Sequence, residues 1–61
     1  SAQARTQLEQ ALNLWRELGD RERETTTLLL LAGIYSSLGE KQKAAALYQQ
    51  SLHGWQIVHP K

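Results

Sequence analysis

A four-residue motif of leucine, glycine, an acidic residue and a basic residue occurs twice in this 61-residue chain, as LGDR at 18–21 and as LGEK at 38–41. Glycine readily adopts the left-handed conformation that follows the last turn of a helix. An acidic residue directly after it suits the positive N-terminus of a following helix. Each motif therefore predicts a tight turn between two helices. Two such turns give three helices, and turns this short make neighbouring helices antiparallel.

Apolar residues recur at helical spacing in all three segments. In the first they fall within an arc of about 120° at 100° per residue. They are Ala4, Leu8, Ala11, Leu12, Trp15 and Leu18. The second segment has Leu28, Leu31, Ala32, Tyr35 and Leu38, and the third has Ala44, Leu47, Tyr48, Ser51, Leu52, Trp55 and Val58. The predicted helices are Ala2–Leu18, Arg21–Leu38 and Glu40–Val58, which gives an all-α chain of antiparallel helical hairpins.

The middle helix is apolar nearly all round, because Leu28 to Leu31 point in four directions and Ile34 adds to the far side. Such a helix is covered on more than one face. We therefore expect a stacked array or an oligomer.

The chain also repeats itself over a longer distance. When residues 1–21 are set over 41–61 without gaps, four residues are identical. The identical pairs are Ala4 and Ala44, Gln10 and Gln50, Leu12 and Leu52, and Trp15 and Trp55. The implied unit has 40 residues and two helices, which is a period typical of an α-solenoid built from helical hairpins.

From Thr25 onward, six residues mark the faces along which the second and third helices would pair: Leu31, Ala32, Tyr35, Ala44, Tyr48 and Ser51. They fill the six core places of a tetratricopeptide repeat, which this part of the chain therefore resembles. Gly39 falls on the turn glycine. The resemblance implies that Ala32, Ala44 and Ser51 are small because the paired helices approach closely, and that the two tyrosines fill the gaps around them.

The resemblance implies about one and a half repeats in a single segment, 1–61. Residues 1–20 would be the second helix of a preceding repeat with its turn, and 21–61 one complete helix-turn-helix repeat. Gln56 replaces the usual proline, which is typical of a long, 40-residue variant found in kinesin light chain-like scaffolds. We expect an excerpt of an array, or a homo-oligomer formed through the exposed apolar stripe of the first helix.

In this family the first helix of each unit lines a concave groove that binds a partner. The ligand-facing places correspond to Thr26, Leu29, Gly33, Ser36 and Ser37. They lack the Lys, Arg and Asn that clamp a terminal carboxylate, so they suit a helix or an extended apolar peptide. The resemblance therefore implies a protein–protein interaction scaffold. The alternatives are a self-association module and a regulatory segment of a larger signalling protein.

We predict no enzyme and no catalytic, cofactor or metal site. His53 and His59 are about 240° apart on a helix, so they cannot share a metal on one face. Trp15 and Trp55 lie on the apolar sides of their helices, so we expect them to pack between helices rather than to stack on a ligand. Gly33 permits a close approach to the backbone, either by a neighbouring helix or by a bound peptide.

The charge and composition of the chain argue against several classes of binding partner. The net charge is +1 with both signs mixed, which argues against nucleic acid and anionic membranes. A DNA-binding domain would need a basic recognition helix, and the third helix has only Lys41 and Lys43 at one end. The stretch LLLLAGIY is too short to cross a bilayer. The absence of cysteine is compatible with a cytoplasmic location, which we expect.

Overall fold

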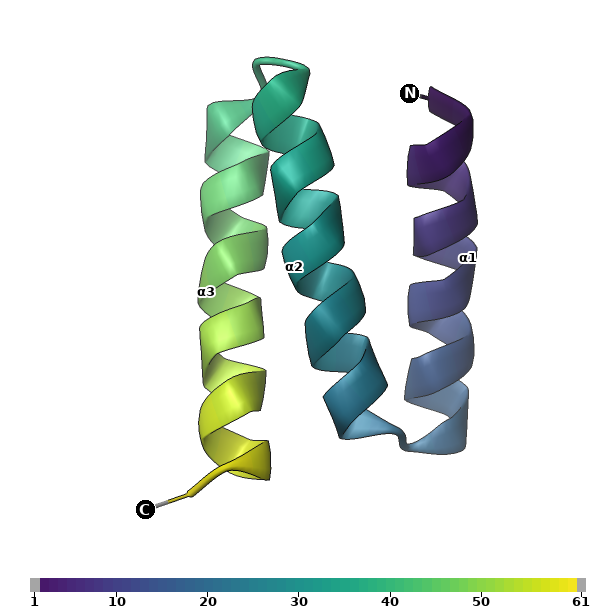
Figure 1. Cartoon of the computed structure of the whole chain (residues 1–61), viewed down its shortest axis with the longest axis vertical. Helices are drawn as coiled ribbons and strands as arrows, with labels where there is room; N and C mark the ends of the chain where they lie inside the picture. The colour runs from purple at the N-terminus through teal and green to yellow at the C-terminus, as the bar shows by residue number, and fades with distance from the viewer. Residues whose placement is uncertain (1, 61) are drawn as a thin grey trace.

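The computed structural model describes residues 2–60, so the two end residues of the predicted segment 1–61 lie outside it. Three antiparallel helices make up the described part: α1 (Ala2–Leu18), α2 (Arg21–Ser37) and α3 (Lys41–Val58) (Figure 1). The predicted all-α class is confirmed. The predicted ends of α2 and α3 at the second turn were one residue too far, because Leu38 and Glu40 are the capping residues that flank the two helices.

Both turns have the same backbone geometry. Gly19 and Gly39 have φ of +71° and +83°, the left-handed conformation that other residues rarely adopt. In each turn the glycine N–H donates to the carbonyl three residues back, and the next N–H donates to the carbonyl five residues back. This pair of bonds satisfies carbonyls at a helix end. In the first turn the Asp20 carboxylate also accepts from the N–H of Arg23 at 3.1 Å, which caps α2.

The three helices lie side by side in one layer (Figure 1). The Cα atoms extend over 33 × 22 × 11 Å, so the arrangement is shallow along the viewing direction of Figure 1. In the described part of the chain α2 packs against both neighbours, while the backbones of α1 and α3 do not approach each other. α2 therefore keeps an outward side that neither neighbouring helix covers.

The core runs through the middle of this layer. Leu12 of α1 and Leu28 and Leu31 of α2 are buried together, and three partly buried side chains pack around them. Those three are Leu8, Tyr35 and Leu47. Within the leucine run of α2, Leu28 and Leu31 are thus buried in the core, while Leu29 and Leu30 between them are about half exposed.

Small residues line the contact between α2 and α3. Ala32, Ala44 and Ser51 are all buried, as predicted. Thr25 and Gly54 are buried with them and were missed by the sequence analysis. The Ser51 hydroxyl donates to the Thr25 carbonyl at 3.4 Å, and a Cβ added to Gly54 would collide with Thr25 Oγ1. These five residues, here called the small-residue crossing, allow the two helices to approach closely.

The turn geometry and the helix geometry predict opposite effects for two glycine substitutions. Gly39→Ala places a Cβ in left-handed backbone and should lower the free energy of unfolding by about 1 kcal/mol. Gly33→Ala is the matched control, because Gly33 has helical backbone and no heavy atom within 4 Å of an added Cβ. It should raise the free energy of unfolding by about 0.5–1 kcal/mol. Urea unfolding followed by circular dichroism measures both. Equal effects of the two substitutions would contradict the turn geometry.

Candidate functional site

The five residues predicted to contact a partner lie on the outward side of α2. Thr26, Leu29, Ser36 and Ser37 are exposed and Gly33 is half-buried. At 100° per residue they fall within an arc of about 100°. We call these five residues the α2 face. Leu30 is also exposed beside them and was missed, although its position next to Leu29 in the leucine run was a signal for it.

No other part of the described chain covers the backbone at Gly33. A Cβ added there would meet no heavy atom within 4 Å apart from its own helix backbone and chain neighbours. Within the described chain, the interpretation that a neighbouring helix requires this glycine is therefore wrong. The alternative, close approach by a bound peptide, is not tested by the chain alone and stays a prediction.

A shallow groove of about 330 Å³ lies between α2 and α3 and borders the α2 face. Its lining is mostly apolar. It consists of Thr25, Thr26, Leu29, Tyr48, Ser51, Leu52 and Trp55. We call it the α2–α3 groove. It contains two of the five predicted contact residues and joins them to the exposed apolar side of α3.

Two aromatic residues of α3 were predicted to fill gaps between helices, and this prediction was wrong within the described chain. Trp55 and Tyr48 are 55% and 45% exposed. The reason is that no helix covers this side of α3, whereas α2 covers the corresponding side of α1. Trp55 instead stacks on His59, with ring centroids 3.9 Å apart.

An ion pair and a cation–π contact link α1 to α2. Arg16 Nε lies 3.1 Å from Glu24 Oε2 in a partly exposed ion pair. The guanidinium of Arg23 lies 5.1 Å from the centroid of the Trp15 ring, within cation–π range. Trp15 is half-buried in this arrangement, so it does lie between two helices, as predicted.

Tyr35 is the central polar contact between the same helices. Its hydroxyl donates to Glu9 Oε2 at 2.9 Å. Its ring lies 5.9 Å from the Arg5 guanidinium and 5.6 Å from Lys43 Nζ. The hydrogen bond to Glu9 raises the pKa of Tyr35 above its ordinary value of 10.0, and desolvation and the negative charge of Glu9 raise it further, against the smaller opposing effects of the two cations.

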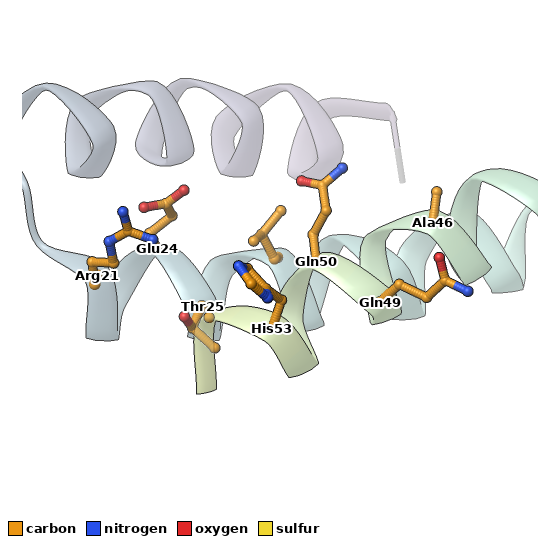
Figure 2. A pocket seen from close by; sticks show the side chains of 9 residues that line it. Arg21, Glu24, Thr25, Ala46, Gln49, Gln50 and His53 are labelled. Carbon is orange, nitrogen blue, oxygen red and sulfur yellow. The ribbon is translucent and has the colours of Figure 1, made fainter. Parts of the chain in front are cut away.

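A second hollow, of about 420 Å³, lies between α2 and α3 on the other broad side of the layer (Figure 2). Its lining includes several polar side chains, Arg21, Glu24, Gln49, Gln50 and His53. In Figure 2 Glu24 and Gln50 point toward α1, while His53 lies beside Thr25. None of the five predicted contact residues lines it.

The described residues hold no group of three or more His, Cys, Asp or Glu side chains that could bind a metal ion. His53 and His59 are both exposed, and they lie in different surroundings, one in the polar hollow and the other against Trp55. Between residues 2 and 60 no helix has both the length and the apolar character needed to cross a membrane.

Comparison with known proteins gives one match. The family model described as tetratricopeptide repeat matches residues 1–56. Searches of curated proteins and of solved structures each returned no significant match.

The raised pKa of Tyr35 predicts a loss of stability at alkaline pH. Because this pKa is higher in the folded than in the unfolded chain, its contribution is complete below about pH 10 and is lost as pH rises through the folded value. Tyr35→Phe should therefore flatten the alkaline decline in the free energy of unfolding. Urea unfolding between about pH 8 and pH 12 measures this.

Tyr48→Phe is the matched control, since it removes an exposed hydroxyl on α3 while leaving the bond to Glu9 intact. Its alkaline decline should follow that of the parent chain. If Tyr35→Phe and the parent chain decline with the same slope, the proposed role of the hydrogen bond is contradicted.

Proposed function

Because the chain belongs to the tetratricopeptide repeat family, we propose that it is a protein–protein interaction module whose α2 face holds one apolar segment of a partner, helical or extended. Family membership supports the general role in protein binding. The α2 face supports the particular mode. No chemistry of the chain's own is part of the proposal.

The observation that carries the proposal is the open, neutral surface around Gly33. Four of the five residues of the α2 face are exposed, and their side chains are hydroxyls or, at Leu29, a half-exposed aliphatic group. The absence of a Cβ at Gly33 leaves room for a partner backbone to come close. A surface without charge on these residues favours a partner segment without charge at the point of contact.

The proposal extends to the length of the repeat. The last residues of α1 and α3, Leu18 and Val58, are 40 positions apart. The two tryptophans have the same spacing, 15 to 55. This common register supports a unit of 40 residues, with α2 and α3 as one complete hairpin and α1 as the second helix of the unit before it.

The size of the surface sets the expected strength of binding. A stable protein–protein interface usually buries about 1,600 Å² in total. One face of a 17-residue helix is a small part of such an interface. We therefore propose that α2 contributes to a groove extended by further units, as in other solenoid proteins. A peptide should bind this single unit weakly.

A charge placed at Gly33 tests the α2 face. Peptides should first be selected for binding from a display library and their affinities measured by fluorescence polarisation. Gly33→Lys should weaken binding by about tenfold or more, equivalent to about 1.4 kcal/mol. The lysine would fill the approach to the backbone and place a charge against an apolar segment.

The matched control is Gln50→Lys, which adds the same charge at an exposed residue of the polar hollow, away from the α2 face. It should leave affinity within about twofold of the parent chain, because exposed side chains outside an interface contribute little. Loss of binding in Gln50→Lys but not in Gly33→Lys would refute the proposed face.

A further inference from the structure

Two neighbouring hollows form one groove on the side of α2 opposite the α2 face. The polar hollow is lined by α2 and α3, and a further hollow of about 260 Å³ is lined by residues of all three helices. Ala46 lines both, so the two are continuous. Their floor follows α2 from Arg21 to Tyr35, which is about 21 Å at 1.5 Å per residue. We call the two hollows together the α1–α3 groove.

A neighbouring unit of an array would leave this groove open. α1 shows which side of such a helix the following helix covers, because most of its apolar stripe, predicted to be exposed, is buried or half-buried. Gln50 of α3, which lines the groove, has the repeat position of Gln10 of α1, and His53 has that of Asn13. Gln10 and Asn13 are exposed although α2 packs against α1. The groove therefore differs from the apolar side of α3, which a following unit would cover.

Most of the charged side chains around the groove already have partners. Those that line it or contact a lining residue are the cations Arg5, Arg16, Arg21 and Lys43 and the anions Glu9, Glu24 and Glu40. Glu9 accepts a hydrogen bond from Tyr35, and the other two carboxylates are paired with Arg16 and Lys43 at 3.1 and 3.2 Å. All three anions are thus engaged within the chain.

Two cations are left over, and they lie at opposite ends of the groove. Within residues 2–60 neither Arg5 nor Arg21 is part of an ion pair. Arg21 lines the polar hollow, while the Arg5 guanidinium lies 5.9 Å from the centroid of the Tyr35 ring at the other end. In Figure 2 the Arg21 side chain extends toward α1, as Gln50 does. The unpaired charge of the groove is therefore positive, which favours an acidic occupant.

The polar side chains of the groove favour an extended occupant over a helix. The amide of Gln50 and the ring of His53 can each donate and accept, and within residues 2–60 neither forms a side-chain hydrogen bond. A helix pairs most of its own backbone groups, whereas an extended segment leaves N–H and C=O groups for such side chains. Gln49 also lines the groove, but its repeat counterpart Glu9 contacts α2, so a following unit would reach it.

We propose that the α1–α3 groove binds an extended acidic segment of a partner protein, about seven residues long, with a carboxylate at each end. Seven residues at about 3.3 Å each match the length of the floor. One carboxylate pairs with Arg21 and the other with Arg5, and apolar side chains between them lie over Ala46 and Leu47. The carboxylates of the groove disfavour the phosphate backbone of a nucleic acid. No residue of the α2 face lines this groove, so the proposal does not depend on the proposed function.

A designed peptide tests the proposal. A fluorescein-labelled peptide of seven residues, with glutamate at each end and alternating serine and leucine between, places its glutamates and leucines on one side when extended. Fluorescence polarisation should show weak, saturable binding with a Kd between about 10 μM and about 1 mM, because the contact is small. Binding should weaken as the salt concentration rises from about 20 to about 200 mM. The peptide with lysine in place of both glutamates should not bind.

The variant that tests the ion pair is Arg21→Glu, which should weaken binding about fivefold or more. Lys41→Glu is the matched control. Arg21 and Lys41 are both exposed, each is the first residue of its helix, and Lys41 lines neither hollow. An acidic residue suits a helix N-terminus, so both variants should keep the helical circular dichroism of the parent chain. Lys41→Glu changes the net charge equally and should stay within about twofold of the parent affinity.

Three outcomes would overturn the proposal. They are no saturable binding of the acidic peptide up to about 5 mM, equal weakening by Arg21→Glu and Lys41→Glu, and displacement of the labelled peptide by a single-stranded oligonucleotide at a lower concentration than by unlabelled peptide. Amide chemical shifts should change most at Ala46, Gln50 and His53, and changes centred on the α2 face would contradict the location. Gly33→Lys should bind the acidic peptide like the parent chain, which separates failure of this proposal from failure of the α2 face.

Discussion

The close approach of α2 and α3 at the small-residue crossing is the constraint on which the rest of the structure depends. Neither helix could keep this distance with a larger side chain at Gly54, because Thr25 already occupies the space that a Cβ would need. Ser51 and Ala44 continue the contact along α3, and both are buried. Close packing of this kind is sensitive to a single added methyl group.

This crossing also decides which surfaces remain open. With its small residues turned toward α3 and Leu31 and Tyr35 turned toward α1, α2 has its outward side left for solvent or a partner. Tyr48, Leu52 and Trp55 of α3 lie beside the crossing, and they are exposed because no further helix of the described chain covers that side of α3. One packing arrangement therefore leaves both the α2 face and this side of α3 exposed. A protein–protein interaction module needs such exposed surfaces.

Much of the fold could be predicted from the sequence, because its signals are local. The two Leu-Gly-acid motifs predicted the turns, and the glycines at 19 and 39 have the positive φ that such turns require. The small residues at 32, 44 and 51 gave the face along which α2 and α3 pair. Gly54 was missed as part of that face, although it follows Ser51 at a spacing of three residues, which keeps it on the same side of the helix.

The extent to which each apolar residue is covered could not be predicted in this way. Tyr48, Leu52 and Trp55 have the same helical pattern as their counterparts on α1, and periodicity identifies an apolar side without saying what packs against it. The difference between Leu12 and Leu52 depends only on whether a neighbouring helix is present. The α2 face could be predicted because its five positions are the ligand-facing places of the family pattern. Leu30 is exposed beside them and was missed, because that pattern does not include its position.

The most direct measurement of the central claim is the free energy of unfolding of Gly54→Ala, alone and with Thr25→Ala. In an unconstrained helix the substitution would stabilise by about 1 kcal/mol. The collision with Thr25 Oγ1 should instead make it destabilising, by about 1–3 kcal/mol, and removing that hydroxyl in the double variant should recover part of the loss. A stabilising Gly54→Ala, with no coupling to Thr25→Ala, would mean that the two helices do not cross where the structure places them.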